Sequence, residues 1–281
     1  MEKFLLKKLL VGTVFGFLLN STTAVAGYGT DLHKFAALGT AWNPGTDSAR
    51  SIGTPAPGGA TWSIMGAGIA SAPVDPHGGS GVTTAFTALL GQTQAEAAAY
   101  IDTIMNVWAN ASDFTNLGQV ADGGSAFGAA NAQDGHLGDI RVGAVFIDGA
   151  VGGNTLAHAF NPCTEGLCGG GGSVGGDTHV DNSNTWVDNA AANGGQLDLF
   201  TVLLHEFGHA LGLGHSTVKG SVMEAIYAGA RRDLHADDIA GIQAIYGAPI
   251  AVPLPGALFM FLSALSALGI FGRRRNSAIS V

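Results

Sequence analysis

The chain has 281 residues, which is room for one sizeable domain with additional segments, and its composition of 47% hydrophobic and 12% charged residues argues against a disordered protein. The formal net charge is −9, from 12 Lys and Arg against 21 Asp and Glu. Half of the basic residues lie near the chain ends, three within residues 3–8 and three within residues 273–275. Sequence-independent binding of nucleic acid depends on clustered Lys and Arg, so we expect no nucleic-acid partner.

The first 26 residues have the three parts of a signal peptide. Lysines precede an apolar run at residues 9–19, and Ala24-Val25-Ala26 forms a small-x-small cleavage site. The run is too short to cross about 30 Å of hydrocarbon, which argues against a first membrane anchor. We therefore expect export machinery to remove residues 1–26, leaving residues 27–56 as an extended, Gly- and Pro-rich N-terminus of the mature chain.

The C-terminal residues 249–281 have the composition of a sorting signal. Residues 254–271 carry no charge and are long enough to form a transmembrane helix, and three arginines follow at 273–275. Together with the Val-Pro-Leu-Pro-Gly run at 252–256, this resembles the PEP-CTERM type of bacterial sorting signal in its VPLP variant. The resemblance implies processing by an exosortase-like enzyme and a final position on or outside the cell surface. A permanent one-helix anchor is the alternative.

Apolar periodicity predicts the regular elements between these ends. Strands are expected at residues 60–65 and 140–147. Thr93 and Glu96 form a capping box, which predicts a helix from there to about residue 110. A second helical, apolar-rich stretch runs over residues 198–213, and this stretch contains the residues with metal-binding chemistry.

Three histidines in this stretch have the spacing of a zinc site. His205 and His209 are four residues apart, so on a helix both imidazoles point the same way and can reach one zinc at roughly 2.0–2.1 Å. Six more residues of helix would carry His215 about 9 Å further along the axis. Gly212 lies between them, and a glycine there can take the left-handed conformation that ends the helix and turns the chain back.

Three neutral histidines with one open coordination position are typical of a catalytic zinc site, because the fourth position is left for water. Glu206, next to His205, is expected on the open side of the site, where it can take a proton from that water as general base. Five specified residues at these spacings arise by chance in on the order of one in 10⁴ to 10⁵ such chains. We therefore reject the alternative that these are three core or surface histidines without a shared metal.

The sequence resembles the metzincin zinc peptidases, and among them the matrixins, or matrix-metalloproteinase group. Ser216 directly follows the third histidine, Ser221-Val222-Met223 stands where the Met-turn should be, and residues 234–247 are similar to the family's last helix. The resemblance covers residues 57–248 and implies an α+β, metzincin-like zincin fold, in which a twisted mixed sheet packs on the active-site helix. It implies that Met223 forms an apolar floor beneath the zinc ligands and that Tyr227 helps to shape the S1′ pocket, although Ala225 replaces the usual proline.

The segments that hold the family's structural zinc and calcium are only partly present. His158 and His179 match two ligands of the structural zinc, but the family's His-Gly-Asp element is missing. Cys163 and Cys168 lie between these histidines, and because the protein is expected to be exported we favour a disulfide between them. The alternative is a rebuilt structural zinc site with two His and two Cys ligands. Asp148, Asp181 and Asn184 could bind calcium through oxygen, or the acidic residues could simply cap backbone amides.

The sequence as a whole predicts an exported zinc endopeptidase that hydrolyses proteins or peptides. The resemblance to the matrixins implies that the substrate lies extended beside an edge strand. A surface or biofilm-matrix binding protein that keeps the fold and metal but has little turnover is the alternative from another class. The intact Glu206 favours the enzyme. No Pro-Arg-Cys-Gly prosegment of the kind that keeps many matrixins latent is found.

Overall fold

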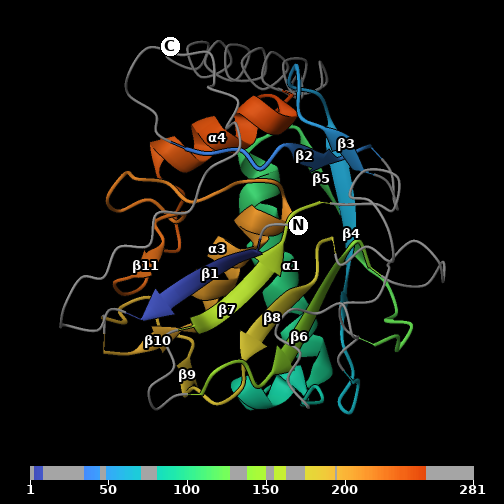
Figure 1. Cartoon of the computed structure of the whole chain (residues 1–281), viewed down its shortest axis with the longest axis vertical. Coiled ribbons are helices and arrows are strands. Elements are labelled where there is room, and N and C mark those ends of the chain that lie inside the picture. The colour runs from blue at the N-terminus through green and yellow to red at the C-terminus, as the bar shows by residue number, and fades with distance from the viewer. Residues whose placement is uncertain are drawn as a thin grey trace, which may run out of the picture. The chain divides into compact units, whose positions relative to one another are not determined.

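A mixed, twisted β-sheet organises this computed structural model (Figure 1), which describes residues 3–8, 35–44, 49–70, 81–126, 138–149, 155–162, 175–193 and 195–250. All of these except Ile250 belong to one compact unit, Met1–Pro249. None of the helices in these ranges has both the length and the apolarity to cross a bilayer. Residues 251–281 of the predicted sorting signal, including the transmembrane helix expected at 254–271, lie outside the described residues, as does most of the predicted leader.

The described strands of the main sheet follow the order β11-β1-β7-β8-β6-β4-β5. The half formed by β5, β4, β6 and β8 is parallel, and β7 then runs antiparallel to β8. The bounds are β4 Gly58–Ile64, β5 Phe114–Gln119, β6 Ile140–Val145, β7 Thr155–Phe160, β8 Thr178–Asp181, β1 Lys3–Lys8 and β11 Ile226–Tyr227. The strands predicted at 60–65 and 140–147 are confirmed as β4 and β6, with shifts of one or two residues at their ends.

Strand β1, Lys3–Lys8, occupies a position that the sequence does not predict, since its pattern assigns these residues to the start of the leader. It lies between β7 and β11, antiparallel to the first and parallel to the second. The register places Leu6 opposite Ala157 and Lys7 opposite Ile226. An extended segment of the chain thus fills the space between the edge of the main sheet and the residues after the Met-turn.

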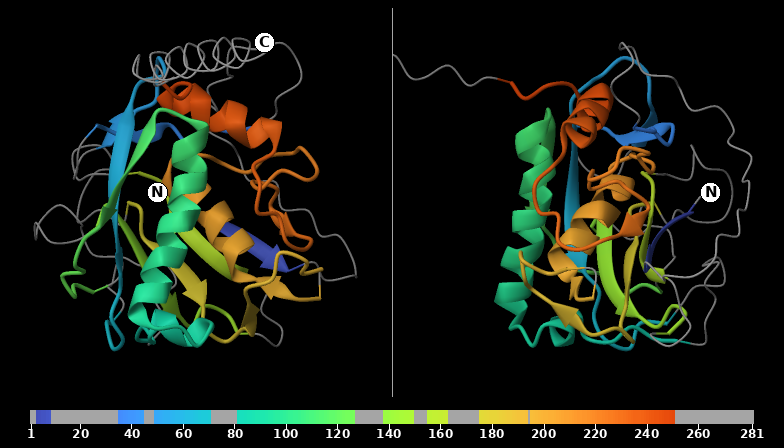
Figure 2. Two further views of the ribbon diagram at one scale, coloured as in Figure 1. Left: turned by 180° about the vertical axis from the view of Figure 1, so that it is seen from behind. Right: turned by 90° about the vertical axis from the view of Figure 1, so that its left-hand side faces the viewer.

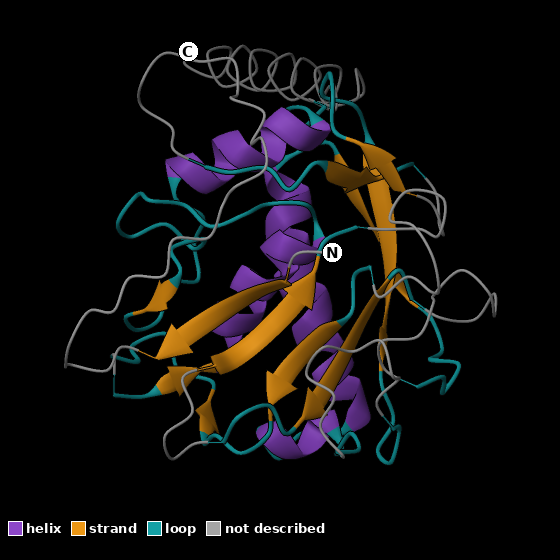
Figure 3. Cartoon of the chain, in the orientation of Figure 1, coloured by secondary structure: helices purple, strands orange, loops and turns teal. Residues whose placement is uncertain are grey.

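Two smaller sheets complete the described β-structure (Figure 3). Strands β2 (Thr40–Trp42) and β3 (Ala49–Ser51) pair antiparallel, and β9 (Trp186–Val187) and β10 (Leu197–Asp198) pair parallel. Because β10 leads directly into the next helix, this second pair fixes the point at which that helix begins.

Helices α1 (Gln94–Ala111) and α3 (Leu199–Ala210) lie on the same side of the sheet, as the right-hand view of Figure 2 shows, and α4 (Ala236–Tyr246) follows near the end of the unit. A short 3-10 helix, η1 (Phe86–Leu89), precedes α1. The capping box predicted for α1 is present: the Thr93 hydroxyl accepts from the Glu96 backbone N–H, and the Glu96 carboxylate accepts from the Thr93 N–H. The predicted helix over 198–213 is shorter than expected, because it ends at Ala210 ahead of a glycine turn.

Helix α3 is buried at every one of its positions, so it lies in the core rather than on the surface. Two tryptophan side chains, both nearly or fully buried, fasten it from outside. The Trp108 indole N–H on α1 donates to the Leu204 carbonyl at 3.0 Å, and the Trp42 indole N–H on β2 donates to the Ala210 carbonyl at 2.9 Å. A helix buried on all sides has little freedom to shift, which is a precondition for holding metal ligands in fixed positions.

Candidate metal centre

The three predicted zinc ligands meet at the C-terminal end of α3. His205 and His209 project from adjacent turns, with their Nε2 atoms 3.0 Å apart. The ring of His215 lies with its centroid 5.3 Å from that of His205 and 4.8 Å from that of His209. One ligand nitrogen from each histidine falls within 4.8 Å of the other two. Two residues of the same helix and one residue beyond it therefore converge on one point.

The turn that returns His215 to this point depends on Gly212. Its φ is +104°, in the left-handed region that favours glycine. A Cβ atom at this position would lie 2.4 Å from the Thr40 carbonyl oxygen, so any other residue would also clash with β2. The predicted role of Gly212 thus has two causes, the backbone conformation and the close approach of a neighbouring strand. Across this turn the Leu38 N–H donates to the Gly212 carbonyl, and the Gly214 N–H donates to the Ala36 carbonyl.

Backbone carbonyls orient two of the imidazoles. Nδ1 of His205 is 2.7 Å from the Val222 carbonyl oxygen, and Nδ1 of His209 is 2.7 Å from the Leu213 carbonyl oxygen. A carbonyl oxygen only accepts, so each Nδ1 must carry the proton, which leaves Nε2 as the lone-pair atom facing the shared point. Burial, with His215 nearby, lowers the pKa of His205 to about 3, and burial lowers the pKa of His209 well below its usual value. Both imidazoles are therefore neutral at physiological pH, as zinc ligation requires.

Glu206 is placed differently from the expectation. We expected its carboxylate on the open side of the site, but the side chain is fully buried. Neither carboxylate oxygen has a hydrogen-bond partner among the described residues, and burial raises the pKa of Glu206 well above its usual value. The expectation failed because α3 is buried all round and because the backbone of β1 lies next to α3. A buried carboxylate without a partner among the described residues, beside the three clustered histidines, fits a bound divalent cation with water, which would supply the missing partner.

The Met-turn lies directly beneath the helix. Met223 is 1% exposed, and a Cβ added to Gly208 on α3 would lie 2.3 Å from the Met223 sulfur. The turn is fixed by Asp238 of α4, whose carboxylate accepts from the backbone N–H groups of Val222 and Met223 at 2.8 and 3.1 Å. Because Val222 in turn supplies the carbonyl that orients His205, the buried Asp238 carboxylate supports the metal centre through the backbone. The sequence reasoning did not assign this role to Asp238.

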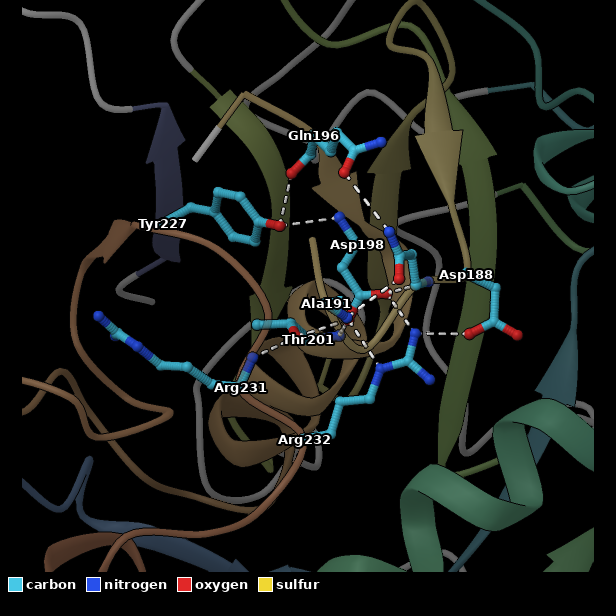
Figure 4. Close-up of polar contacts among 9 residues, drawn as sticks. Asp188, Ala191, Gln196, Asp198, Thr201, Tyr227, Arg231 and Arg232 are labelled. Carbon is cyan, nitrogen blue, oxygen red and sulfur yellow. Dashed lines mark hydrogen bonds and ion pairs between the residues drawn. The ribbon is translucent and has the colours of Figure 1, made fainter. Parts of the chain in front are cut away.

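A polar cluster at the start of α3, drawn in Figure 4, was also missed. Asp198 caps the helix by accepting from the Thr201 N–H at 3.1 Å, and the Arg232 guanidinium forms an ion pair with the same carboxylate. The Tyr227 hydroxyl accepts from the Asp198 N–H at 2.9 Å and donates to the Gln196 carbonyl at 2.7 Å. An Asp just before an apolar helix is a capping signal that the sequence contained, whereas its pairing with Arg232, 34 residues away, left no local signal.

The structure brings together only some of the residues predicted for a structural zinc site. His158 on β7 lies opposite His179 on β8, with Nε2 of the first 2.9 Å from Nδ1 of the second, and both are fully buried. The Asp177 carboxylate lies 4.0 Å from His179 Nε2. Cys163 and Cys168 lie outside the described residues. Two imidazoles alone do not complete the four-coordinate shell of a structural zinc.

The predicted calcium ligands lie at or just after the C-terminal ends of the parallel strands β6 and β8. Asp181 ends β8 and pairs in register with Val145, which ends the parallel strand β6 three residues before Asp148. Asp181 is fully buried, and one of its oxygens accepts from the N–H and hydroxyl of Ser183. Its other carboxylate oxygen and the amide oxygen of Asn184 are buried and have no hydrogen-bond partner among the described residues. Asp148 accepts from the Thr155 N–H at 3.1 Å.

A helix with the pattern His-Glu-x-x-His, a glycine turn, a third histidine and a buried methionine beneath them is the arrangement of the metzincin class of zinc sites. Comparison with known proteins agrees with this. The Peptidase M10 (Matrixin) family model matches residues 88–247, which is more than half of the chain, so the chain belongs to the matrixin family.

Curated relatives match over a shorter stretch. Matrix metalloproteinase-25 of Mus musculus is 45% identical over 100 residues, covering 34% of this chain and 15% of that protein. Matrilysin of Rattus norvegicus is 44% identical over 98 residues, or 34% of this chain and 33% of that protein. Karilysin of Tannerella forsythia is 38% identical over 108 residues, or 38% of this chain and 21% of that protein. The aligned part thus spans a third or less of each of these relatives.

We predict that His209→Ala abolishes zinc binding by the full chain, because the two remaining imidazoles leave the ion under-coordinated. The loss of affinity should exceed the roughly 10- to 100-fold that loss of an outer-shell partner costs. Zinc content after dialysis, measured by atomic emission, checks this against the control His77→Ala, which removes a histidine far from the motif in sequence and should keep the metal. Equal zinc content in the His209→Ala and unaltered chains would show that this cluster is not the zinc site.

Proposed function

We propose that the protein is an exported, zinc-dependent endopeptidase that hydrolyses peptide bonds in protein or peptide substrates. The observation that carries the proposal is the convergence of three histidine nitrogens within 4.8 Å, next to the fully buried carboxylate of Glu206 on α3, which has no hydrogen-bond partner among the described residues. Zinc held by His205, His209 and His215 would supply a Lewis acid and lower the pKa of a bound water toward about 7. Membership of the matrixin family supports the assignment.

Glu206 is the group that handles protons in this proposal. The Glu206 side chain is fully buried and therefore poorly solvated, which raises its pKa and makes the carboxylate a better proton acceptor than a surface glutamate. It accepts a proton from the attacking water and holds it at a carboxyl oxygen until the leaving amine takes it. During this proton transfer the rings of His205 and His209 keep their orientation, because their Nδ1 atoms are hydrogen-bonded to the backbone carbonyls of Val222 and Leu213, respectively.

We also propose that substrate binds as an extended strand along β7. The backbone of the chain's own residues Lys3–Lys8 supports this, since it lies beside α3 and pairs with β7 on one side and β11 on the other. Backbone pairing of this kind accepts many sequences, and specificity then comes from pockets for individual side chains. A protein substrate would bind in the same direction, antiparallel to β7.

Export, removal of residues 1–26 and processing of residues 249–281 by an exosortase-like enzyme remain our proposal, supported by the sequence pattern at the two ends. We also retain the disulfide between Cys163 and Cys168 as a proposal. Its alternative, a second zinc held with His158 and His179, is supported by the 2.9 Å approach of the two buried imidazoles.

Incubation of the zinc-loaded chain without residues 1–26, which leaves the position beside β7 free for substrate, with a diverse peptide mixture tests the enzyme directly. Internal cleavage products, detected by mass spectrometry, should appear without chelator and disappear when a chelator removes the zinc. If the zinc-loaded protein cleaves nothing but binds cell-surface or matrix material, the alternative function of a binding protein with little turnover is correct.

We further propose that calcium binds beside the C-terminal ends of β6 and β8, through Asp148 and Asp181 together with Asn184. The buried, unpartnered oxygens of Asp181 and Asn184 support this, because oxygen ligands of this type suit calcium.

Calcium should therefore raise the melting temperature of the protein, since a ligand bound only by the folded state stabilises it by about 2.7 kcal/mol at 100 times its Kd. Asp181→Asn should remove most of this increase, while Asp233→Asn, which removes the same charge from an exposed position, should keep it. Thermal unfolding with and without calcium makes the comparison. An unaltered protein that calcium does not stabilise would end the assignment of Asp148 and Asp181.

A further inference from the structure

Strand β1 lies in the position that a bound peptide would need (Figure 1). It runs antiparallel to β7 on one side and parallel to β11 on the other, and it contacts α3, the helix that carries two of the zinc ligands. A strand with a partner on each side has its backbone hydrogen-bonding groups paired in both directions. The first residues of the chain therefore fill the site in the manner of an extended peptide.

The register of β1 places it next to the metal centre. Lys7 and Lys8 pair with Ile226 and Tyr227 of β11. These two residues of β11 line a pocket together with the zinc ligand His205. An incoming peptide cannot pair with Ile226 and Tyr227 while β1 does so. Binding of a substrate along both strands therefore requires that β1 leaves.

The sequence of β1 determines what kind of block this is. Its six residues, Lys-Phe-Leu-Leu-Lys-Lys, include no Cys, His, Asp or Glu, which are the side chains that usually bind zinc. The strand thus occupies the place of the substrate without offering a side-chain ligand to the metal. The three histidines remain available, so the complete chain should bind zinc as fully as the chain without its leader.

The covalent link makes the block effective even if the pairing itself is weak. Residues 9–34 join β1 to the rest of the compact unit. A tethered segment acts at an effective concentration of about 1 mM, so a segment with a Kd of about 0.1 mM would fill the site about 90% of the time and slow cleavage about tenfold. Cutting the link removes this advantage, because the released segment is diluted into bulk solution.

We propose that residues 3–8 keep the precursor latent by pairing as a substrate-like strand between β7 and β11, and that removal of residues 1–26 activates the enzyme. The leader then has a second role besides export, and proteolysis begins only after the leader has been cut off. Latency of this kind needs no thiolate from a prosegment. This inference rests on the proposed endopeptidase function and names the regulation of the same site.

The first test compares full chains, made in a host that leaves residues 1–26 in place. Successive residues of a strand direct their N–H groups to opposite sides, so Leu5→Pro together with Leu6→Pro removes one donor toward each neighbouring strand. This pair should raise kcat/KM for a peptide substrate at least about 10-fold, close to the value of a chain that begins at Gly27. The matched control, Leu5→Val with Leu6→Val, keeps both donors and should stay latent. Zinc content and melting temperature check that each protein is folded and loaded.

The second test adds the segment back as a separate molecule. A synthetic peptide of residues 1–10 should inhibit the chain that begins at Gly27 competitively, raising KM for the substrate without changing kcat. The same peptide with proline at positions 5 and 6 should inhibit at least about 10-fold more weakly. Zinc content should not change in either case, because the block does not involve the metal.

Binding measurements separate this inference from the enzyme assignment. In Glu206→Gln proteins, a fluorescent peptide of residues 1–10 should bind at least about 10-fold more weakly to the full chain, whose site is filled, than to the chain that begins at Gly27. Equal binding to both, or cleavage by the full chain as fast as by the chain from Gly27 and by the proline pair, would overturn the latency. If no zinc-loaded form cleaves any peptide, the proposed function is refuted, and the binding comparison still decides whether β1 fills the site.

Discussion

The metal centre depends on a single reversal of the chain at Gly212. Two histidines four residues apart on a helix are common, but a third ligand reaches them only if the helix stops after His209 and the chain turns back within a few residues. The left-handed conformation of Gly212 provides the turn, and the Thr40 carbonyl lies so close that no side chain fits there. The bonds from Gly212 and Gly214 to Leu38 and Ala36 then hold the returning segment in place. The position of His215 therefore depends both on Gly212 and on the adjacent segment that contains Ala36, Leu38 and Thr40.

The rest of the fold holds α3 rigidly while giving its polar side chains unusual surroundings. Two buried tryptophans bond to carbonyls of the helix, Asp198 caps its start, and Asp238 holds the Met-turn beneath it. Complete burial keeps the imidazoles of His205 and His209 neutral and raises the pKa of Glu206. A buried carboxylate without a partner lowers stability, and sites that perform chemistry are where a protein retains such groups. The same surroundings that weaken the fold locally make Glu206 a strong proton acceptor.

The sequence predicted the local features well and the long-range ones poorly. The capping box of Thr93 and Glu96, the strands β4 and β6, the zinc motif and the glycine turn are encoded within a few residues, and period or spacing reveals them. The contacts of Arg232 with Asp198 and of Arg231 with Thr201 join residues 30 or more positions apart, and no local pattern marks them. Glu206 was expected on an open face because neighbouring residues on a helix usually differ in exposure, but α3 is buried all round. The place of Lys3–Lys8 in the sheet was missed because its lysines and leucines also fit a leader.

The account rests on Glu206 acting as a proton acceptor and not as a zinc ligand, and one substitution separates these roles. Glu206→Gln keeps the size of the side chain but cannot take the proton of the attacking water at neutral pH. Zinc content and peptide cleavage should be measured on the same preparation. We expect full zinc occupancy, thermal stability no lower than that of the unaltered protein because a buried ionisable group is removed, and cleavage slower by about 10² to 10⁴. Full zinc occupancy with cleavage at the original rate would contradict the account.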